Sequence, residues 1–224
     1  MQSRFGPRPA NRAGVRARGA ELPRRPAAES RRPTITERAR REQLVEVTIA
    51  LIAEHGYAAT SLARIAEAAE ISKAAVLYHF TSKNAVVEAA YRAALDALVA
   101  HVGAAVDAAP GPGAAVEAYV TAMIGYLAEH PGHGRVITEA LRQGERIGVA
   151  DSPSSEARWR PLADLVVRAQ EAGEYRAEID ARTLALVVNG AIDAVVAESM
   201  EDRGFALATA APEVVALLAR AART

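Results

Sequence analysis

Two lysines, and the small residues beside one of them, are the side chains in this sequence best suited to contacting a nucleic acid. Lys73 and Lys83 are the only lysines among 224 residues, and Lys73 lies in the run Ser72-Lys73-Ala74-Ala75. A lysine ammonium can donate hydrogen bonds to the guanine acceptors of the major groove, and an alanine methyl can contact the methyl group of thymine. On the exposed face of a helix this run would therefore read base edges, and Lys83 would bind phosphate.

The residues around this run predict two short helices joined by a tight turn. Thr60 can cap the first helix, which runs to about residue 69, and Ser72 can cap the second. Only Glu70 and Ile71 lie between them. Two short helices across so tight a turn must cross steeply, which is the geometry of a helix-turn-helix.

A longer helix over about residues 36–55 supplies the third side of a small core. Thr34 and Glu37 have the spacing of a capping box, in which each side chain satisfies a free amide of the other residue. Apolar residues then recur at helical spacing. Gly56 follows as a left-handed C-terminal stop.

The rest of the chain predicts longer helices and shows no strand pattern. They cover about residues 84–108, 114–130, 133–144, 159–173 and 180–200, and Pro212 is placed to open the last one. The helix at 114–130 is apolar nearly all round and is therefore expected to be central. The fold class is all-α, with about nine helices: an N-terminal three-helix DNA-binding domain with a helix-turn-helix, then a larger helical domain.

Charge is distributed unevenly along the chain, although its formal net charge is zero. Residues 1–33 hold nine Arg against two Glu, residues 34–83 are balanced, and residues 84–224 hold twelve Arg against nineteen acidic residues. A basic front end and an acidic body suit a protein that meets a polyanion at one end.

The chain divides into three predicted parts. Residues 1–33 have almost no large apolar side chain, so we expect a disordered Arg/Pro-rich tail, either a basic arm on DNA or an extension without a role. Residues 34–83 form the helix-turn-helix DNA-binding domain. Residues 84–224 form a larger helical domain.

Several chemistries have no support in the sequence. Cysteine is absent, and neither a Ser-His-Asp order nor a glycine-rich nucleotide loop occurs. The histidines do not form a metal-ligand set, since His130 and His133 flank a Pro-Gly break. We therefore expect no enzyme, cofactor or metal. No apolar run reaches about 18 residues, so no membrane span is expected, and a cytoplasmic location is compatible.

Two segments, Gly56–Ala66 (GYAATSLARIA) and Ile71–Lys83 (ISKAAVLYHFTSK), resemble the TetR family of bacterial regulators. The resemblance covers about residues 38–90 and rests on several spacings that agree at once, from the glycine after the first helix to the Ser-Lys pair that opens the fourth. It implies a sequence-specific DNA-binding transcriptional regulator in which residues 84–224 are the helical effector-binding and dimerisation domain. It also implies a homodimer formed mainly by the last two long helices.

The resemblance places the DNA contacts by position. Thr60 and Ser61 would cap the second helix near phosphate, Ser72, Lys73, Ala74 and Ala75 would enter the major groove, and His79 and Lys83 would hold the DNA backbone, with Leu77 and Tyr78 on the same helix. Two departures from the family pattern stand out. Glu70 occupies a turn position where the family usually has Gly. The family's Tyr before the His-Phe pair is displaced, because position 77 is Leu and Tyr78 comes one residue later.

The later helices carry residues that would line an effector pocket and a dimer interface. The expected pocket residues are Tyr119, Met123, Tyr126, Ile137, Leu141, Trp159, Leu162 and Asn189. The expected dimer residues are Leu184, Val188, Ala191, Ile192, Val195, Val214, Val215 and Leu218. The competing interpretation of the pocket set is ordinary core packing, and that of Asn189 is a polar pair with Asp193 at a helix surface or dimer seam.

The leading hypothesis is a repressor that binds a near-palindromic double-stranded DNA operator and is released by a small apolar or amphipathic effector. Release requires that the effector bind more tightly to the conformation that no longer fits the operator. One alternative is a ligand-independent activator or architectural DNA-binding protein. Another is a helical enzyme or carrier that uses the same cavity.

Overall fold

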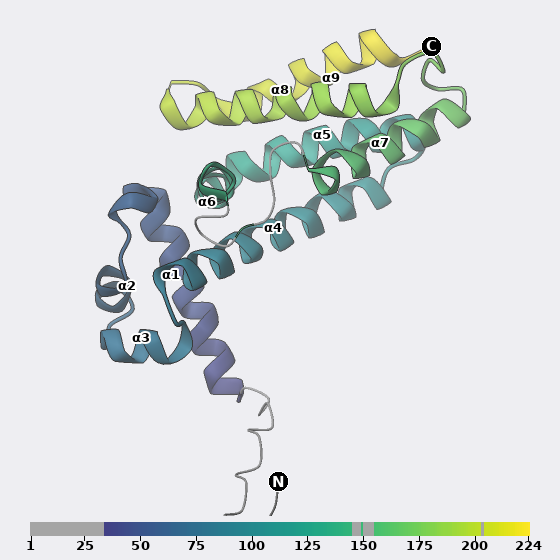
Figure 1. Cartoon of the computed structure of the whole chain (residues 1–224). Coiled ribbons are helices and arrows are strands. Elements are labelled where there is room, and N and C mark those ends of the chain that lie inside the picture. Colours follow the sequence, from purple (N-terminus) through teal and green to yellow (C-terminus); the bar gives the residue numbers. More distant parts are fainter. Residues whose placement is uncertain (1–33, 145–148, 150–154, 203) are drawn as a thin grey trace, which may run out of the picture. The chain divides into compact units, whose positions relative to one another are not determined.

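Nine helices make up the part of the chain that the structure, a computed structural model, describes: residues 34–144, 149, 155–202 and 204–224 (Figure 1). They are α1 (Ile35–Ala59), α2 (Leu62–Ala68), α3 (Lys73–His79), α4 (Lys83–Asp107), α5 (Pro112–Glu129), α6 (Pro131–Gln143), α7 (Glu156–Glu171), α8 (Ala181–Glu201) and α9 (Leu207–Ala222). The all-α prediction is confirmed. The predicted disordered tail, residues 1–33, lies outside the described residues.

Local capping explains the bounds of the first three helices. The capping box of Thr34 and Glu37 forms as predicted, with the Glu37 N–H donating to Thr34 Oγ1 at 3.2 Å. Gly56 has a φ of 77°, so the left-handed break after the first helical segment is confirmed, although the chain resumes helical geometry for a few residues. Ser72 caps α3 by accepting the N–H of Ala75.

The described side chains form two clusters of buried hydrophobic residues. The first joins α1, α2 and α3 to the first half of α4, with Leu44, Ile65 and Val76 at its centre. The second joins the rest of α4 to α5, α7, α8 and α9. Because α4 contributes to both clusters, packing marks no break at the predicted boundary between residues 83 and 84, and that boundary stays a prediction.

The helix α5 is central, as its all-round apolar character predicts. It packs against α4, α7, α8 and α9, and the last two lie side by side above it in Figure 1. Pro212 does not open the last helix: α9 begins at Leu207 and contains Pro212. Pro212 is the sixth residue of α9, past the four N–H groups that have no partner inside a helix, so α9 lacks the backbone bond that residue 212 would donate to the carbonyl of Ala208.

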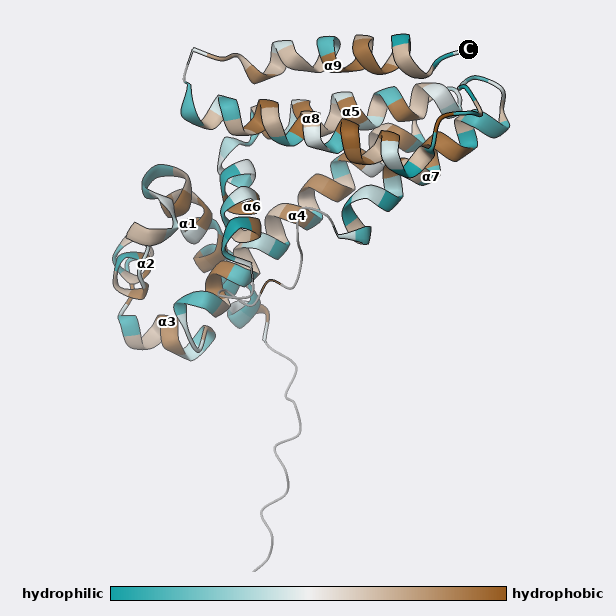
Figure 2. Cartoon of the chain, turned by 45° about the horizontal axis from the view of Figure 1, so that its top comes forward, coloured by the Kyte–Doolittle hydropathy of each residue, from teal (hydrophilic) through white to brown (hydrophobic). Residues whose placement is uncertain are grey.

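Two of the helices, α4 and α8, are long and apolar enough to cross a membrane by length and composition alone. That is weak evidence, because core helices of water-soluble proteins pass the same test. Each of the two helices packs against several others here. Figure 2 shows hydrophobic and hydrophilic residues alternating along α9, the pattern of a helix with one buried face.

Candidate functional site

A Schellman motif joins α2 to α3. The N–H of Ile71 donates to the carbonyl of Ala66 at 2.9 Å, and the N–H of Glu70 donates to the carbonyl of Glu67 at 3.0 Å. A Schellman motif needs a left-handed backbone at the residue that follows the end of the helix. Glu70 holds this position and has a φ of 55°. Glu70 is the only non-glycine residue with positive φ among those described. The chain therefore makes the tight turn of a helix-turn-helix with an acidic residue where glycine would fit better.

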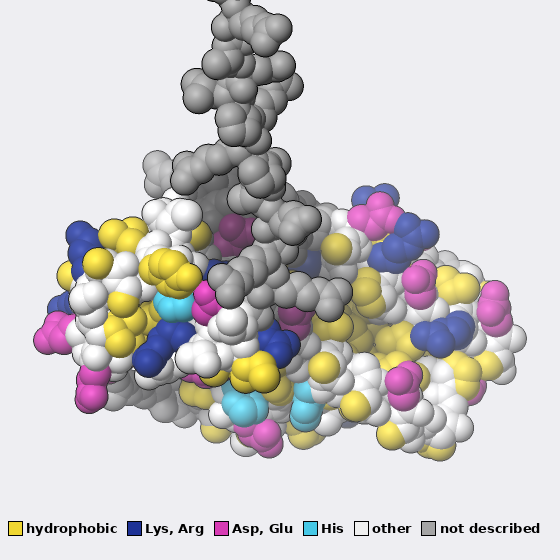
Figure 3. Space-filling model, turned by 90° about the horizontal axis from the view of Figure 1, so that it is seen from below, with side chains coloured by type: hydrophobic (Ala, Val, Ile, Leu, Met, Phe, Trp, Pro, Cys, Tyr) yellow, Lys and Arg dark blue, Asp and Glu magenta, His cyan; other side chains and the backbone are white. Residues whose placement is uncertain are grey.

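The outer face of α3 carries most of the residues predicted to enter a groove. Ser72, Lys73 and Ala74 are exposed, and Ala75 is half-buried. Val76 and Phe80 are buried in the small core, which fixes the opposite face of the helix inward. In Figure 3, a view from below, hydrophobic, basic and acidic side chains mix over the region of α2 and α3. The role of these residues in reading bases stays a prediction, and the exposure of the helix face is compatible with it.

The last turn of α3 is fixed by bonds to α1. Tyr78 is 74% exposed, and its hydroxyl donates to Glu37 Oε1 at 3.0 Å. Arg41 donates to the carbonyl of His79, and its guanidinium lies 4.1 Å from the centre of the Phe80 ring. The displaced tyrosine therefore lies beside the capping box of α1, and Arg41, which sequence reasoning missed, helps hold α3 in place.

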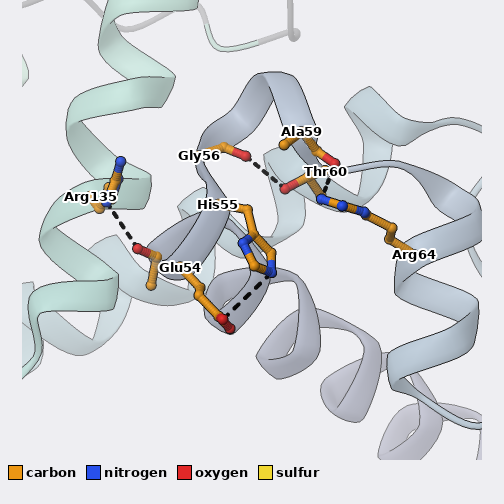
Figure 4. Close-up of polar contacts among 8 residues, drawn as sticks. Glu54, His55, Gly56, Ala59, Thr60, Arg64 and Arg135 are labelled. Atoms are coloured by element: carbon orange, nitrogen blue, oxygen red, sulfur yellow. Dashed lines mark hydrogen bonds and ion pairs between the residues drawn. The ribbon is translucent and has the colours of Figure 1, made fainter.

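Thr60 and Lys83, two further predicted DNA contacts, also have partners inside the protein. Thr60 does not cap α2: Ser61 does, and Thr60 is 2% exposed with its hydroxyl donating to the carbonyl of Gly56 at 2.9 Å (Figure 4). The buried Thr60 hydroxyl closes the turn after α1. The prediction that Thr60 lies near phosphate is therefore wrong, and its role is structural. Lys83 donates to the carbonyl of Tyr57 at 2.6 Å and lies 3.8 Å from that ring's centre. Burial lowers the pKa of its ammonium.

A cavity of about 560 Å³ lies among α4, α5, α6, α7 and α8. Its lining is mainly hydrocarbon, from residues such as Leu98, Val102, Met123, Leu127 and Ile137. This size and lining are typical of small-molecule sites, which bury most of a ligand in apolar surroundings and orient it with a few polar groups.

The polar groups of the cavity gather where α5, α7 and α8 meet. Arg158 Nη2 binds both carboxylate oxygens of Asp193, at 2.8 and 3.0 Å. Asn189 Nδ2 donates to the Arg158 carbonyl at 3.0 Å. Tyr119 lies nearby, and burial raises the pKa of its hydroxyl to about 12. Asn189 therefore lines the cavity while holding the residue that pairs with Asp193.

Five of the eight predicted pocket residues line this cavity, namely Tyr119, Met123, Ile137, Leu141 and Asn189. The other three do not. Leu162 is fully buried in the core, Trp159 packs 4.7 Å from the Arg182 guanidinium, and Tyr126 is engaged with histidines.

Sequence reasoning missed the charged lining of α7, which includes Arg158, Asp164 and Arg168. The available signal was their spacing. Together with Pro161, they recur every three or four residues and so share one helix face.

Most of the predicted dimer residues pack within the chain itself. Val188, Ile192, Val214 and Leu218 are buried in the second cluster, and Leu184, Ala191, Val195 and Val215 pack against it. The four buried residues are therefore core residues of the single chain, whereas the interface role of the four partly buried ones stays a prediction. The exposed apolar side chains of the same two helices are Leu186, Val187 and Leu217, at 40%, 64% and 65% exposure.

Three of the histidines meet around one tyrosine, a packing cluster that their spacing in the sequence did not predict. The Tyr126 hydroxyl lies 2.7 Å from His133 Nδ1, and the rings of His101 and His130 lie 5.1 and 4.4 Å from the Tyr126 ring. Burial and the neighbouring His130 lower the pKa of His133. No group of three or more His, Cys, Asp or Glu among the described residues is placed to hold a metal ion.

Comparisons with known proteins agree with this fold. A family model described as "Bacterial regulatory proteins, tetR family" matches residues 44–90. The HTH-type transcriptional repressor KstR2 of Mycobacterium tuberculosis is 27% identical over 146 residues, 63% of this chain and 72% of that protein.

Two solved structures share the fold at lower identity. The fatty acid degradation regulator FadR from Bacillus halodurans is 22% identical with a TM-score of 0.70, covering 80% of this chain and 94% of that one. FadR from Bacillus subtilis in complex with stearoyl-CoA is 18% identical with a TM-score of 0.67, covering 80% and 97%. With its helix-turn-helix and further helices, the chain is a DNA-binding transcriptional regulator whose residues 44–90 match the TetR-family model.

Proposed function

We propose that this regulator is a repressor that binds a near-palindromic operator as a homodimer and leaves it when a small apolar or amphipathic molecule fills the cavity. A recognition helix of seven residues contacts few base pairs, so two copies are needed for affinity and specificity. The exposed start of α3, led by Ser72 and Lys73, supports its entry into the major groove. This function places the protein in the cytoplasm with its DNA.

The observation that carries the release step is the position of α6. One face of this helix lines the cavity through Ile137, Thr138 and Leu141. Another face packs on α1, where Val136 and Ala140 are buried in the cluster of the DNA-binding helices.

A side-chain bond adds to this contact between α6 and α1. Arg135 Nη1 donates to the carbonyl of Ala53 at 3.0 Å, beside the break at Gly56 (Figure 4). A ligand that shifts α6 therefore acts directly on the helix that supports α3.

The homodimer is proposed on the exposed apolar face of α8 and α9. Leu186, Val187 and Leu217 are large, exposed and on the two helices that carry the family's dimer contact. Light scattering should give twice the mass of one chain, and Val187→Glu should shift the mass toward one chain, because a charge in an apolar seam is costly to bury. An unchanged mass for this variant would place the interface elsewhere.

Operator binding is tested by selecting duplexes from a random pool with the full chain. We expect enrichment of a near-palindrome whose half-sites lie about one helical turn apart. Fluorescence anisotropy on the selected duplex then measures affinity with and without molecules that bind the cavity, and a repressor of this type should lose affinity with them. No enrichment would refute operator binding, and affinity indifferent to cavity ligands would favour the ligand-independent alternative.

A further inference from the structure

We infer that the cavity binds an uncharged molecule with a hydrocarbon body and a single alcohol or ketone oxygen, and that this oxygen hydrogen-bonds to the hydroxyl of Tyr119. The inference rests on the proposed function, because it names the chemical class of the effector. It has its own test, which does not depend on DNA.

Tyr119 is a buried polar group that points to a ligand. Its residue is 7% exposed and lines the cavity, yet none of the described residues hydrogen-bonds to its hydroxyl. Unlike the Tyr175 hydroxyl, which is fully enclosed, the unpaired Tyr119 hydroxyl is open to the cavity, where a ligand can replace the water that bonds to it. Burial raises the pKa of this hydroxyl to about 12, so it keeps its proton at neutral pH and can both donate and accept. An oxygen on the ligand supplies the missing partner.

The charges around Tyr119 are already satisfied, which favours an uncharged ligand group. Arg158 is held by both oxygens of Asp193. A ligand carboxylate beside Tyr119 would compete with Asp193 for Arg158 and would be repelled by the Asp193 carboxylate. A ligand cation would meet Arg158 instead. An alcohol or ketone binds Tyr119 and leaves the pair intact.

The remaining charged lining has no net charge, although no ion pair joins its two members in the described part of the chain. Asp164 and Arg168 are the other charged residues among the described lining, one of each sign. The described lining is therefore electrically neutral as a whole. Away from these groups the walls are hydrocarbon, and 560 Å³ lies within the range of drug-sized sites. The body of the ligand is accordingly apolar.

Four probes with the same ten-carbon chain test the inference on the full-length protein: 1-decanol, 2-decanone, decanoate and decylammonium. Isothermal titration at pH 7.5, below the micellar concentrations, measures each affinity. We expect 1-decanol and 2-decanone to bind at least about tenfold more tightly than either ion, because burying a charge without a partner is unfavourable. Decanoate binding as tightly as 1-decanol, or no binding by any probe within its solubility, would overturn the inference.

Two matched tyrosine variants assign the hydroxyl. Tyr119→Phe should weaken 1-decanol about 2- to 10-fold, the loss of one hydrogen bond, while keeping the apolar wall. Tyr175→Phe is the control, since Tyr175 is also buried, with a pKa raised to about 12, but does not line the cavity. Equal effects of the two variants, or none from Tyr119→Phe, would refute the role of Tyr119.

The selected operator separates this inference from the proposed function. Affinity for that duplex without any probe should be the same for both variants and the unmodified chain. Normal operator binding together with a preference for decanoate would refute the inference about the ligand but not the proposed repressor function. Absence of operator binding in the unmodified chain would remove the proposed function itself.

Discussion

Replacing Glu70 by glycine should stabilise the protein, because Glu70 holds a backbone conformation that suits glycine. Its φ of 55° lies in the left-handed region, where the Cβ of an L-residue crowds the following carbonyl. The two backbone bonds of the Schellman motif, donated by Glu70 and Ile71, keep it there. The strain is therefore a cost of the tight turn between α2 and α3.

The expected gain is the difference of two terms. A left-handed non-glycine residue costs about 1–2 kcal/mol, and glycine removes that cost. Glycine also makes the unfolded chain more flexible, which lowers stability by about 0.4–1 kcal/mol. The net effect of Glu70→Gly is a stabilisation of about 1 kcal/mol, which raises the unfolding temperature of a chain of this size by about 2–4 °C.

Glu70→Ala is the control that separates backbone strain from charge. Alanine removes the carboxylate but keeps a Cβ in the left-handed region, so thermal or urea unfolding should show little gain. Both variants remove a negative charge near the predicted DNA surface, so both should bind the selected operator more tightly and to a similar degree. If alanine stabilises as much as glycine, or glycine gives no gain, the strain argument is wrong.

Three further predictions concern the recognition helix, the link between domains and pH. Lys73→Ala should weaken binding to the selected operator by about 1–3 kcal/mol in anisotropy without changing the unfolding free energy. Lys83→Ala should lower the unfolding free energy by about 1–2 kcal/mol, because it removes a hydrogen bond and a cation–π contact. The reverse pattern would exchange the roles of the two lysines. Arg135→Met should leave cavity binding intact but reduce the effect of the ligand on operator affinity by about 0.5–2 kcal/mol, and full coupling in this variant would exclude the bond from the release step. Burial and the neighbouring His130 lower the pKa of His133 in the folded chain, so the unfolded chain binds a proton at His133 more tightly. The contribution of neutral His133 to stability should therefore be complete above about pH 6.5 and should fall as the pH drops below that value. His133→Asn should flatten this fall in urea unfolding at pH 5 to 8, and an unchanged slope would assign it to other groups.

The helix-turn-helix could be predicted from sequence because local contacts determine it. The Thr34 and Glu37 capping box, the Gly56 break and the Ser72 cap each depend on residues within three positions of one another. The left-handed backbone of Glu70 was not predicted from the turn length; the resemblance only marked its position as one where the family usually has Gly. The Thr60 cap was wrong by one residue, because two adjacent hydroxyls compete for the cap and Thr60 bonds back to the Gly56 carbonyl.

The effector domain was less predictable because its sites depend on contacts between distant helices. Apolar periodicity predicts that Leu162 and Met123 point inward, but it does not distinguish a packed core from a cavity wall. The same ambiguity affected α8, where the apolar stripe through Val188 packs within the chain while Val187 is exposed. The pairing of Arg158 with Asp193 joins residues 35 apart in sequence, and no local pattern marks it.

The packing of α6 limits what an effector can do in this protein. Its two faces meet the cavity and α1, and Gly132 lies against Ile49 and Ala53 of α1, with 3.4 Å from an ideal Cβ position to the nearest side-chain atom of each. A ligand that fits the cavity without moving α6 would bind both conformations equally and so leave operator affinity unchanged, however tightly it bound. A releasing ligand must therefore contact the α6 wall at Ile137 or Leu141 more favourably in the shifted position. The length of the ligand's apolar body, rather than its polar group at Tyr119, should accordingly decide whether it acts as an inducer or as a silent occupant.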